Sequence, residues 1–295
     1  MPPLISVVMS TYNRANLLPQ AIESVLNQSF DDFEFIIVND NSTDNTDEIL
    51  KSYKDNRVKI FTNKTNCGCT FNYHNENTLS KGKYIAHIDD DDIWLDKKLE
   101  RQYEYMENNQ WIAITGTYIE TFGDNVRPSW IFYTEPKEID FSMNFYNPIC
   151  HSSVMYRKDY IEKNGINYDI TKRCAQDFDF YKQIILSGGN IVNIPEVLVK
   201  YRMHPIRLTD IIETQQIQID VAEKTKAELR ARYLNKEEEE RFKYLTEGFP
   251  FNEYNKYNVL GAVQMLENKI NKTDINFIKA IDKIKTDILN NLYKF

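Results

Sequence analysis

The chain has 295 residues, of which 42% are hydrophobic and 27% charged, and its formal net charge at pH 7 is −8. This length fits one large domain, or one domain with a helical appendage, and the composition is that of a globular rather than a disordered protein. The negative charge argues against a general nucleic-acid-binding surface, and we see neither a signal peptide nor an apolar run of the roughly 20 residues that cross a bilayer, which predicts a cytoplasmic protein.

The first half of the chain alternates strand and helix signals. Short, almost continuous apolar runs predict strands at residues 4–10, 33–39, 58–63 and 83–88. Apolar residues at helical spacing, with Pro19 in a first turn, predict a helix within 11–29, and the following strands lead into helices at 47–54, 70–82 and 94–102. This alternation indicates an α/β fold with a mostly parallel sheet flanked by helices, in which ligands bind beyond the carboxyl ends of the strands.

The second half is less regular. Residues 111–156 combine short strands, loops and many aromatic residues, which suits a segment that faces a substrate or an inserted hairpin. A helix is predicted at 175–189 and a strand at 190–194, with Pro195 starting a return segment. After residue 205 Glu, Lys, Ile and Leu dominate, and only 247–255 interrupts a helical pattern. We therefore predict a first domain at 1–205 and a C-terminal helical region at 206–295.

The most unusual stretch is "AHIDDDDIW", in which four aspartates, Asp89 to Asp92, follow an apolar strand. Two carboxylates 5–6 Å apart repel by roughly 3 kcal/mol at an effective dielectric constant near 20. A cleft at a strand end would need a cation such as Mg²⁺ or Mn²⁺, which prefer oxygen ligands. The alternative is a solvated acidic turn that caps the helix at 94–102. The apolar strand before the run and Trp94 after it favour the cleft.

Four stretches in this order resemble family 2 glycosyltransferases of the GT-A fold: "ISVVMSTYNRANLLPQAIESVLNQS", "FIIVNDNSTDNT", "KGKYIAHIDDDDIW" and "YRMHP". The similarity covers about residues 4 to 205. It implies a GT-A-like, Rossmann-type sheet and an inverting, metal-dependent enzyme that moves a sugar from a nucleotide-sugar donor, with a UDP-sugar the commonest choice. A hexosyl- or N-acetylhexosaminyltransferase of polysaccharide biosynthesis is the implied type.

The resemblance also assigns site residues. The stretch "STYNR" would line the nucleotide pocket through Thr11, Tyr12 and Arg14. Asp40 would contact the base, although an Asx turn or helix cap would explain an aspartate there equally well. The metal-binding motif falls on Asp89 to Asp91. The resemblance places Asp89 near the ribose and the metal, gives Asp91 to the Mn²⁺ or Mg²⁺ ion, and puts His204 near the diphosphate or the ion. Asp92 would lie behind the metal ligands or on the acceptor side.

The catalytic base of the family lies in an acidic pair at the start of a helix, which matches Gln176–Asp177 here. The glutamine departs from the pattern, so the acceptor class stays open. Asp177 is the predicted base and Asp179 a rival two residues away. An ordinary helix cap is the alternative role for Asp177.

Two other functions remain open. A catalytically silent carbohydrate-binding or scaffold protein on the same fold would explain Gln176. A sugar nucleotidyltransferase is the other, although "STYNRAN" lacks the glycine-rich phosphate loop that such enzymes carry. The expected partners are a nucleotide sugar and a carbohydrate or glycolipid acceptor.

The end of the chain carries an apolar helical stripe: Phe277, Ile278, Ile281, Ile284, Ile288, Leu292 and Phe295. A helix packed on its own domain is one interpretation. Contact with a second copy of the chain, or peripheral binding to a membrane surface, are the alternatives.

Overall fold

The chain divides into two compact units. The computed structural model describes residues 2–124, 126, 132–204, 212–246, 256–270 and 274–289. The first unit comprises Met1–Thr134 and Ile149–Ala222, and the second comprises Glu135–Pro148 and Glu223–Phe295. The boundary predicted after residue 205 lies outside the described residues, as does the predicted break at 247–255, so the two-domain division at that point stays a prediction.

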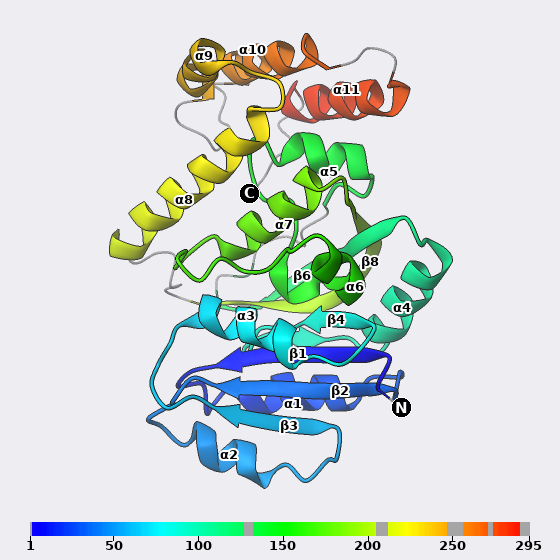
Figure 1. The fold of residues 1–295 in the computed structure, drawn as a ribbon, viewed down its shortest axis with the longest axis vertical. Coiled ribbons are helices and arrows are strands. Elements are labelled where there is room, and N and C mark those ends of the chain that lie inside the picture. The colour runs from blue at the N-terminus through cyan, green and yellow to red at the C-terminus, as the bar shows by residue number, and fades with distance from the viewer. Residues whose placement is uncertain are drawn as a thin grey trace. The chain divides into compact units, whose positions relative to one another are not determined.

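The first unit contains an eight-stranded sheet with the strand order β3-β2-β1-β4-β7-β6-β8-β5. Figure 1 labels β3, β2, β1, β4, β6 and β8 of this sheet. Neighbours among β3, β2, β1 and β4 are parallel, β6 and β8 are parallel to each other, and β7 is antiparallel to both of its neighbours. The strands are β1 (Ile5–Thr11), β2 (Phe33–Asn39), β3 (Val58–Thr62), β4 (Tyr84–His87), β5 (Ile93–Trp94), β6 (Ile112–Gly123), β7 (Met155–Arg157) and β8 (Asn190–Met203). The α/β class predicted from the sequence is confirmed.

Helices connect these strands. They are α1 (Leu18–Leu26), α2 (Thr46–Ser52), α3 (Cys69–Leu79), α4 (Lys98–Asn108), the 3₁₀ turn η1 (His151–Ser153), α6 (Lys158–Lys163) and α7 (Gln176–Leu186). Strands β1, β2 and β4 are almost wholly buried, which explains their continuous apolar sequences. Pro19 lies in the first turn of α1, where its missing N–H loses no hydrogen bond.

Two sequence predictions in this unit were wrong. Ile93–Trp94 is not helical but pairs with Val199–Lys200 as the short strand β5, so α4 begins only at Lys98. Strand β8 does not stop at residue 194 but continues through Pro195 to Met203. The register against β6 skips Pro195 and Glu196, and such a bulge accommodates a proline that has no N–H for the ladder.

Helices make up the described part of the second unit. They are α5 (Pro136–Ser142), the last residues of α8 (Ile212–Arg230), α9 (Lys236–Thr246), α10 (Lys256–Glu267) and α11 (Ile275–Leu289). In the sequence, the segment that contains α5 lies between β6 and β7, but it belongs to the second unit. The irregular stretch 111–156 therefore contributes to both units.

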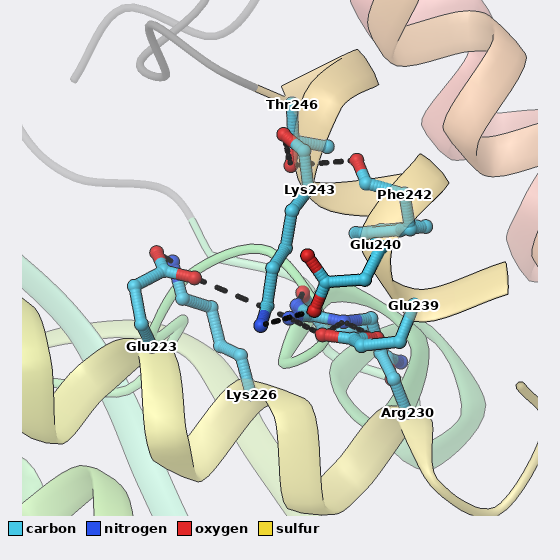
Figure 2. Close-up of polar contacts among 9 residues, drawn as sticks. Glu223, Lys226, Arg230, Glu239, Glu240, Phe242, Lys243 and Thr246 are labelled. Atoms are coloured by element: carbon cyan, nitrogen blue, oxygen red, sulfur yellow. Dashed lines mark hydrogen bonds and ion pairs between the residues drawn. The ribbon is translucent and has the colours of Figure 1, made fainter. Parts of the chain in front are cut away.

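Arg230, which is 2% exposed, joins three parts of this second unit (Figure 2). Its guanidinium donates to the Glu239 carboxylate, with the shortest contact at 2.6 Å, and to the backbone oxygen of Asn144 at 2.7 Å. It also lies 4.6 Å from the centre of the Phe242 ring. The end of α8, the start of α9 and the segment after α5 are thereby tied together.

The apolar stripe of α11 is buried within the second unit. Phe277, Ile281, Ile284 and Ile288 are each at most 5% exposed, and α11 packs against α5 and α10. This supports a helix packed on its own domain, while Leu292 and Phe295 lie outside the described residues. None of the helices in the described parts of the chain has the length and apolar character needed to cross a membrane.

Candidate functional site

A cavity of about 1170 Å³ opens at the carboxyl ends of β1, β2 and β4. Because these strands are parallel, the residues that follow them meet at one edge of the sheet. All the predicted site residues except Asp177 line this cavity: Thr11, Tyr12, Arg14, Asp40, Asp89, Asp91 and His204. The structure thus brings together residues that lie up to 193 positions apart.

The loops after β1 and β2 hold each other in place. The backbone N–H of Asn13 donates to the Ser42 hydroxyl, and the Asn13 side-chain oxygen accepts from the backbone N–H of Thr43. Asn13 and Asn41 both adopt positive φ angles, which asparagine tolerates better than most residues. These hydrogen bonds fix the backbone of the loop that carries Tyr12 and Arg14.

Asp40 ties the loop between β3 and α3 to the end of β2. Its side chain is 2% exposed and accepts hydrogen bonds from the backbone N–H groups of Cys67 (2.9 Å) and Gly68 (2.8 Å) and from the Asn63 amide (2.7 Å). The alternative role as a helix cap is wrong, because α2 begins at Thr46. A carboxylate has about four acceptor positions, so one remains for a ligand.

Asp90 and Asp91 form an acidic wall of the cavity. Arg14 lies 3.6 Å from Asp90 and 3.8 Å from Asp91, and His204 Nε2 lies 2.9 Å from Asp91 Oδ2. Burial and the neighbouring charge of Asp91 raise the pKa of Asp90 to about 7. Burial and the charge of Asp89 also raise the pKa of Asp91, against the opposing effect of His204. The raised pKa values show that the single arginine does not offset the repulsion that would arise if all these carboxyls were ionised.

Asp92 is turned away from the cavity. It is 1% exposed and accepts the backbone N–H of Arg202 at 2.7 Å. The Arg202 side chain in turn donates to the backbone oxygen of Asp91 and to Gln20. Asp92 therefore anchors β8 to the aspartate run. The interpretation of the run as the N-terminal cap of a helix is wrong, because α4 begins six residues after Asp92.

Two histidines that the sequence analysis did not identify hold Asp89. His87 Nε2 lies 3.2 Å and His151 Nδ1 3.6 Å from Asp89 Oδ1, and the two rings are in contact at an interplanar angle of 40°, with centroids 3.8 Å apart. Although burial raises the pKa of Asp89, hydrogen bonds from His151 and His87 lower it well below its usual range. The sequence could have identified His87, because it stands two residues before Asp89, and residues i and i+2 at a strand end point to the same face.

These three side chains offer ligand atoms within 4.8 Å of one another, as a metal site would. Bonds of 2.0–2.1 Å to one tetrahedral ion would keep two imidazole centroids roughly 5 Å apart. The observed centroid separation of 3.8 Å is shorter, so the geometry fits two imidazoles beside one carboxylate better than it fits a closed metal site.

Asp177 and Asp179 differ sharply in environment. Asp179 is 2% exposed and accepts hydrogen bonds from Lys172, Lys182 (2.6 Å) and Gln183 (3.0 Å). Although burial raises the pKa of Asp179, the two lysines lower it overall. Burial raises the pKa of Asp177 despite the opposing charge of His151. Asp177 stands outside the cavity lining, yet close enough to His151 and Asp89 to interact with their charges.

Comparisons with known sequences identify the family of this chain. Residues 6–165 match glycosyl transferase family 2. An uncharacterised glycosyltransferase of Haemophilus influenzae is 31% identical over 246 residues, which are 79% of this chain and 75% of that protein. The O-antigen biosynthesis glycosyltransferase WbnJ of Escherichia coli is 33% identical over 215 residues, covering 68% of this chain and 80% of WbnJ.

Solved structures share the fold. TarS of S. aureus, residues 1–349 in complex with UDP-GlcNAc, superposes with a TM-score of 0.64 at 17% identity, covering all of this chain and 93% of that one. The mannosyltransferase PcManGT of Pyrobaculum calidifontis, in complex with GDP-Man and Mn²⁺, superposes with a TM-score of 0.61 at 14% identity. The alignment covers all of this chain and 82% of PcManGT. With the sequence match over more than half of its length, this chain belongs to glycosyl transferase family 2 and is a glycosyltransferase.

Proposed function

We propose that the protein is an inverting transferase that uses a UDP-sugar and a divalent cation to glycosylate a hydroxyl of a carbohydrate or lipid-linked acceptor. The observation that carries this proposal is the cavity at the strand ends, where Asp40, Asp89 and the Asp91–His204 pair face one space. Residues 1–205 would form the catalytic domain. The similarity to an O-antigen enzyme supports a role in polysaccharide biosynthesis.

Asp40 is proposed to accept the N–H of uracil. Its carboxylate already holds the β3–α3 loop, and its remaining acceptor position suits one donor. Tyr12, which is 44% exposed, offers a ring beside the base, while Thr11 and Arg14 contact the rest of the nucleotide. TarS binds UDP-GlcNAc, which supports uridine as the nucleoside of the donor, whereas PcManGT binds GDP-Man. The experiment below therefore compares the nucleobases directly.

Asp91 and His204 fit a divalent cation. A carboxylate and an imidazole 2.9 Å apart stand on a wall where a single arginine does not offset the repulsion between ionised carboxyls. Mn²⁺ accepts both ligand types, and Mg²⁺ prefers oxygen. Asp89 would accept hydrogen bonds from the ribose hydroxyls and would lie at the edge of the cation site. When bound, such an ion acts as a Lewis acid that neutralises charge on the departing diphosphate.

Asp177 is proposed as the base. Transfer with inversion needs one group that takes the proton of the acceptor hydroxyl as its oxygen attacks the anomeric carbon. A raised pKa, caused by burial, makes Asp177 a stronger base than an ordinary carboxylate. Asp179 is unsuited because its oxygens are engaged by two lysines and Gln183.

Calorimetry with UDP, GDP and dTDP, each with Mn²⁺ and with excess chelator, tests the proposal. We expect tight, metal-dependent binding of UDP, followed by release of UDP from a UDP-sugar when acceptor candidates are added. Preference for GDP would overturn the choice of donor. Binding without release from any nucleotide sugar would favour the silent carbohydrate-binding protein, and release of pyrophosphate from UTP and a sugar phosphate would favour the nucleotidyltransferase.

A further inference from the structure

A buried polar pair lies behind Asp89, on the side away from the cavity. Glu76 of α3 and His87 of β4 are each 1% exposed. Glu76 Oε2 lies 3.8 Å from His87 Nδ1, which is too long for a hydrogen bond, and neither the Glu76 carboxyl nor Nδ1 has a hydrogen-bond partner among the described residues. Buried polar groups without partners are costly, so their retention here calls for an explanation.

The two ring nitrogens of His87 face different neighbours. Nε2 faces the Asp89 carboxylate at 3.2 Å, and a carboxylate can only accept, so Nε2 carries the proton and donates. Nδ1 is then an acceptor, and it faces the carboxyl group of Glu76. The Glu76 carboxyl lies beside Nδ1 without a hydrogen bond to it, so it limits where the ring can lie by contact alone. The hydrogen bond of His87 that reaches the site is the one from Nε2 to Asp89 Oδ1.

Asp89 is consequently fixed through one oxygen. Oδ1 faces His87 and His151, and the backbone N–H of Asp89 donates to the Ser152 hydroxyl at 3.1 Å. The Asp89 side chain is 29% exposed and lines the cavity. With Oδ1 held from behind, Oδ2 is the oxygen left to accept from a ligand in the cavity.

We propose that His87, backed by Glu76, is a positioning residue that aims the Asp89 carboxylate at the ribose hydroxyls of the donor nucleotide. This inference rests on the proposed function, because it takes a nucleotide as the ligand of Asp89. His151, hydrogen-bonded through Nε2 to the Tyr168 hydroxyl at 2.9 Å, lies beside His87 and brings Nδ1 to 3.6 Å from the same oxygen.

The test compares two nucleotides that differ only at the ribose hydroxyls, toward which Asp89 is aimed, so that any effect of Asp89 on the cation is common to both. UDP has both ribose hydroxyls, and 2′,3′-dideoxyuridine diphosphate has neither. Calorimetry with Mn²⁺ measures both affinities for the wild type, His87→Leu, His87→Gln and the control His74→Leu. His74 is a partly buried histidine of α3 that bonds to the backbone oxygen of Tyr168 and does not line the cavity.

His87→Leu should weaken UDP binding by roughly 10- to 100-fold more than it weakens binding of the dideoxy nucleotide, the usual loss for a hydrogen bond to a charged group. His87→Gln should stay within about threefold of the wild type, because its amide N–H can replace the Nε2–H donor. His74→Leu should change neither affinity. Thermal unfolding of each variant confirms that it is folded.

Equal losses for the two nucleotides in His87→Leu would show that the residue supports the fold only, and this would overturn the inference. Unchanged UDP affinity in His87→Leu would do the same. A wild type that binds neither nucleotide would refute the UDP-transferase proposal itself, a result distinct from selective failure of the variants.

Discussion

Replacement of Asp177 by Asn is the sharpest test of the proposed chemistry, with Asp179→Asn as its matched control. Both residues lie in the first turn of α7, and both changes remove one negative charge. If Asp177 is the base, its loss should lower turnover by about 10²- to 10⁴-fold, or roughly 3–5 kcal/mol of barrier. The free energy of unfolding should change by at most about 1 kcal/mol, which is the usual contribution of a charge at a helix N-terminus.

Asp179→Asn should show the opposite pattern. The substitution removes the carboxylate shared by Lys172 and Lys182, and Lys182 is only 6% exposed. Breaking such a buried ion pair costs about 3–5 kcal/mol. For a chain of this size, that corresponds to a melting temperature lower by roughly 6–20 °C. Turnover per folded molecule at low temperature should stay within a few fold.

The assay pairs initial rates of UDP release with thermal unfolding for the two variants. Donor affinity, measured alongside, should stay close to wild type in Asp177→Asn. A loss of less than tenfold in the rate of that variant would refute the base assignment. A large rate loss in a well-folded Asp179→Asn would instead move the base by two residues.

Four further outcomes are expected. Asp91→Asn should abolish the difference in UDP affinity between Mn²⁺ and chelator in calorimetry; a difference that persists would place the metal elsewhere. Asp40→Ala should weaken UDP at least tenfold, because both an acceptor and the anchor of the β3–α3 loop are lost, whereas unchanged affinity would remove Asp40 from the base pocket. Arg230→Met should destabilise the second unit by about 3–5 kcal/mol in chemical denaturation by leaving Glu239 unpaired; a loss below about 1 kcal/mol would contradict the role described for this pair. The folded-state pKa of Asp179 is lowered, so its stabilisation is present above its unfolded pKa near 3.9 and is lost as pH falls; wild type should therefore lose more stability than Asp179→Asn between pH 6 and pH 2, and equal losses would contradict this reasoning.

The first half of the fold was predictable because its signals are local. Strands β1, β2 and β4 are buried on both faces and therefore read as unbroken apolar runs. The failures depended on distant partners. Nothing near Trp94 in the sequence shows that it pairs with Val199, and nothing near Pro195 shows the bulge against β6.

The site divides in the same way. Asp40, Asp91 and His204 could be assigned from motifs, and the structure places them around one cavity. The separate environments of the four aspartates could not be predicted, since His151 and Arg202 reach Asp89 and Asp92 only through the folded sheet. The buried Glu76 reads as an ordinary polar position of α3 until its neighbour His87 is seen.

The position of α5 in the chain has a consequence for synthesis. Ile139 and Phe141 are fully buried in the second unit, yet the helix that packs against α5, α11, begins at Ile275, roughly 130 residues after α5 ends. At about 5–20 residues per second, the ribosome needs roughly 7–26 s to reach that partner. During that interval the apolar face of α5 lacks its partner helix, while the later strands of the sheet are being synthesised. We expect this stretch to be where a chaperone engages the growing polypeptide, and where premature termination yields an aggregating product.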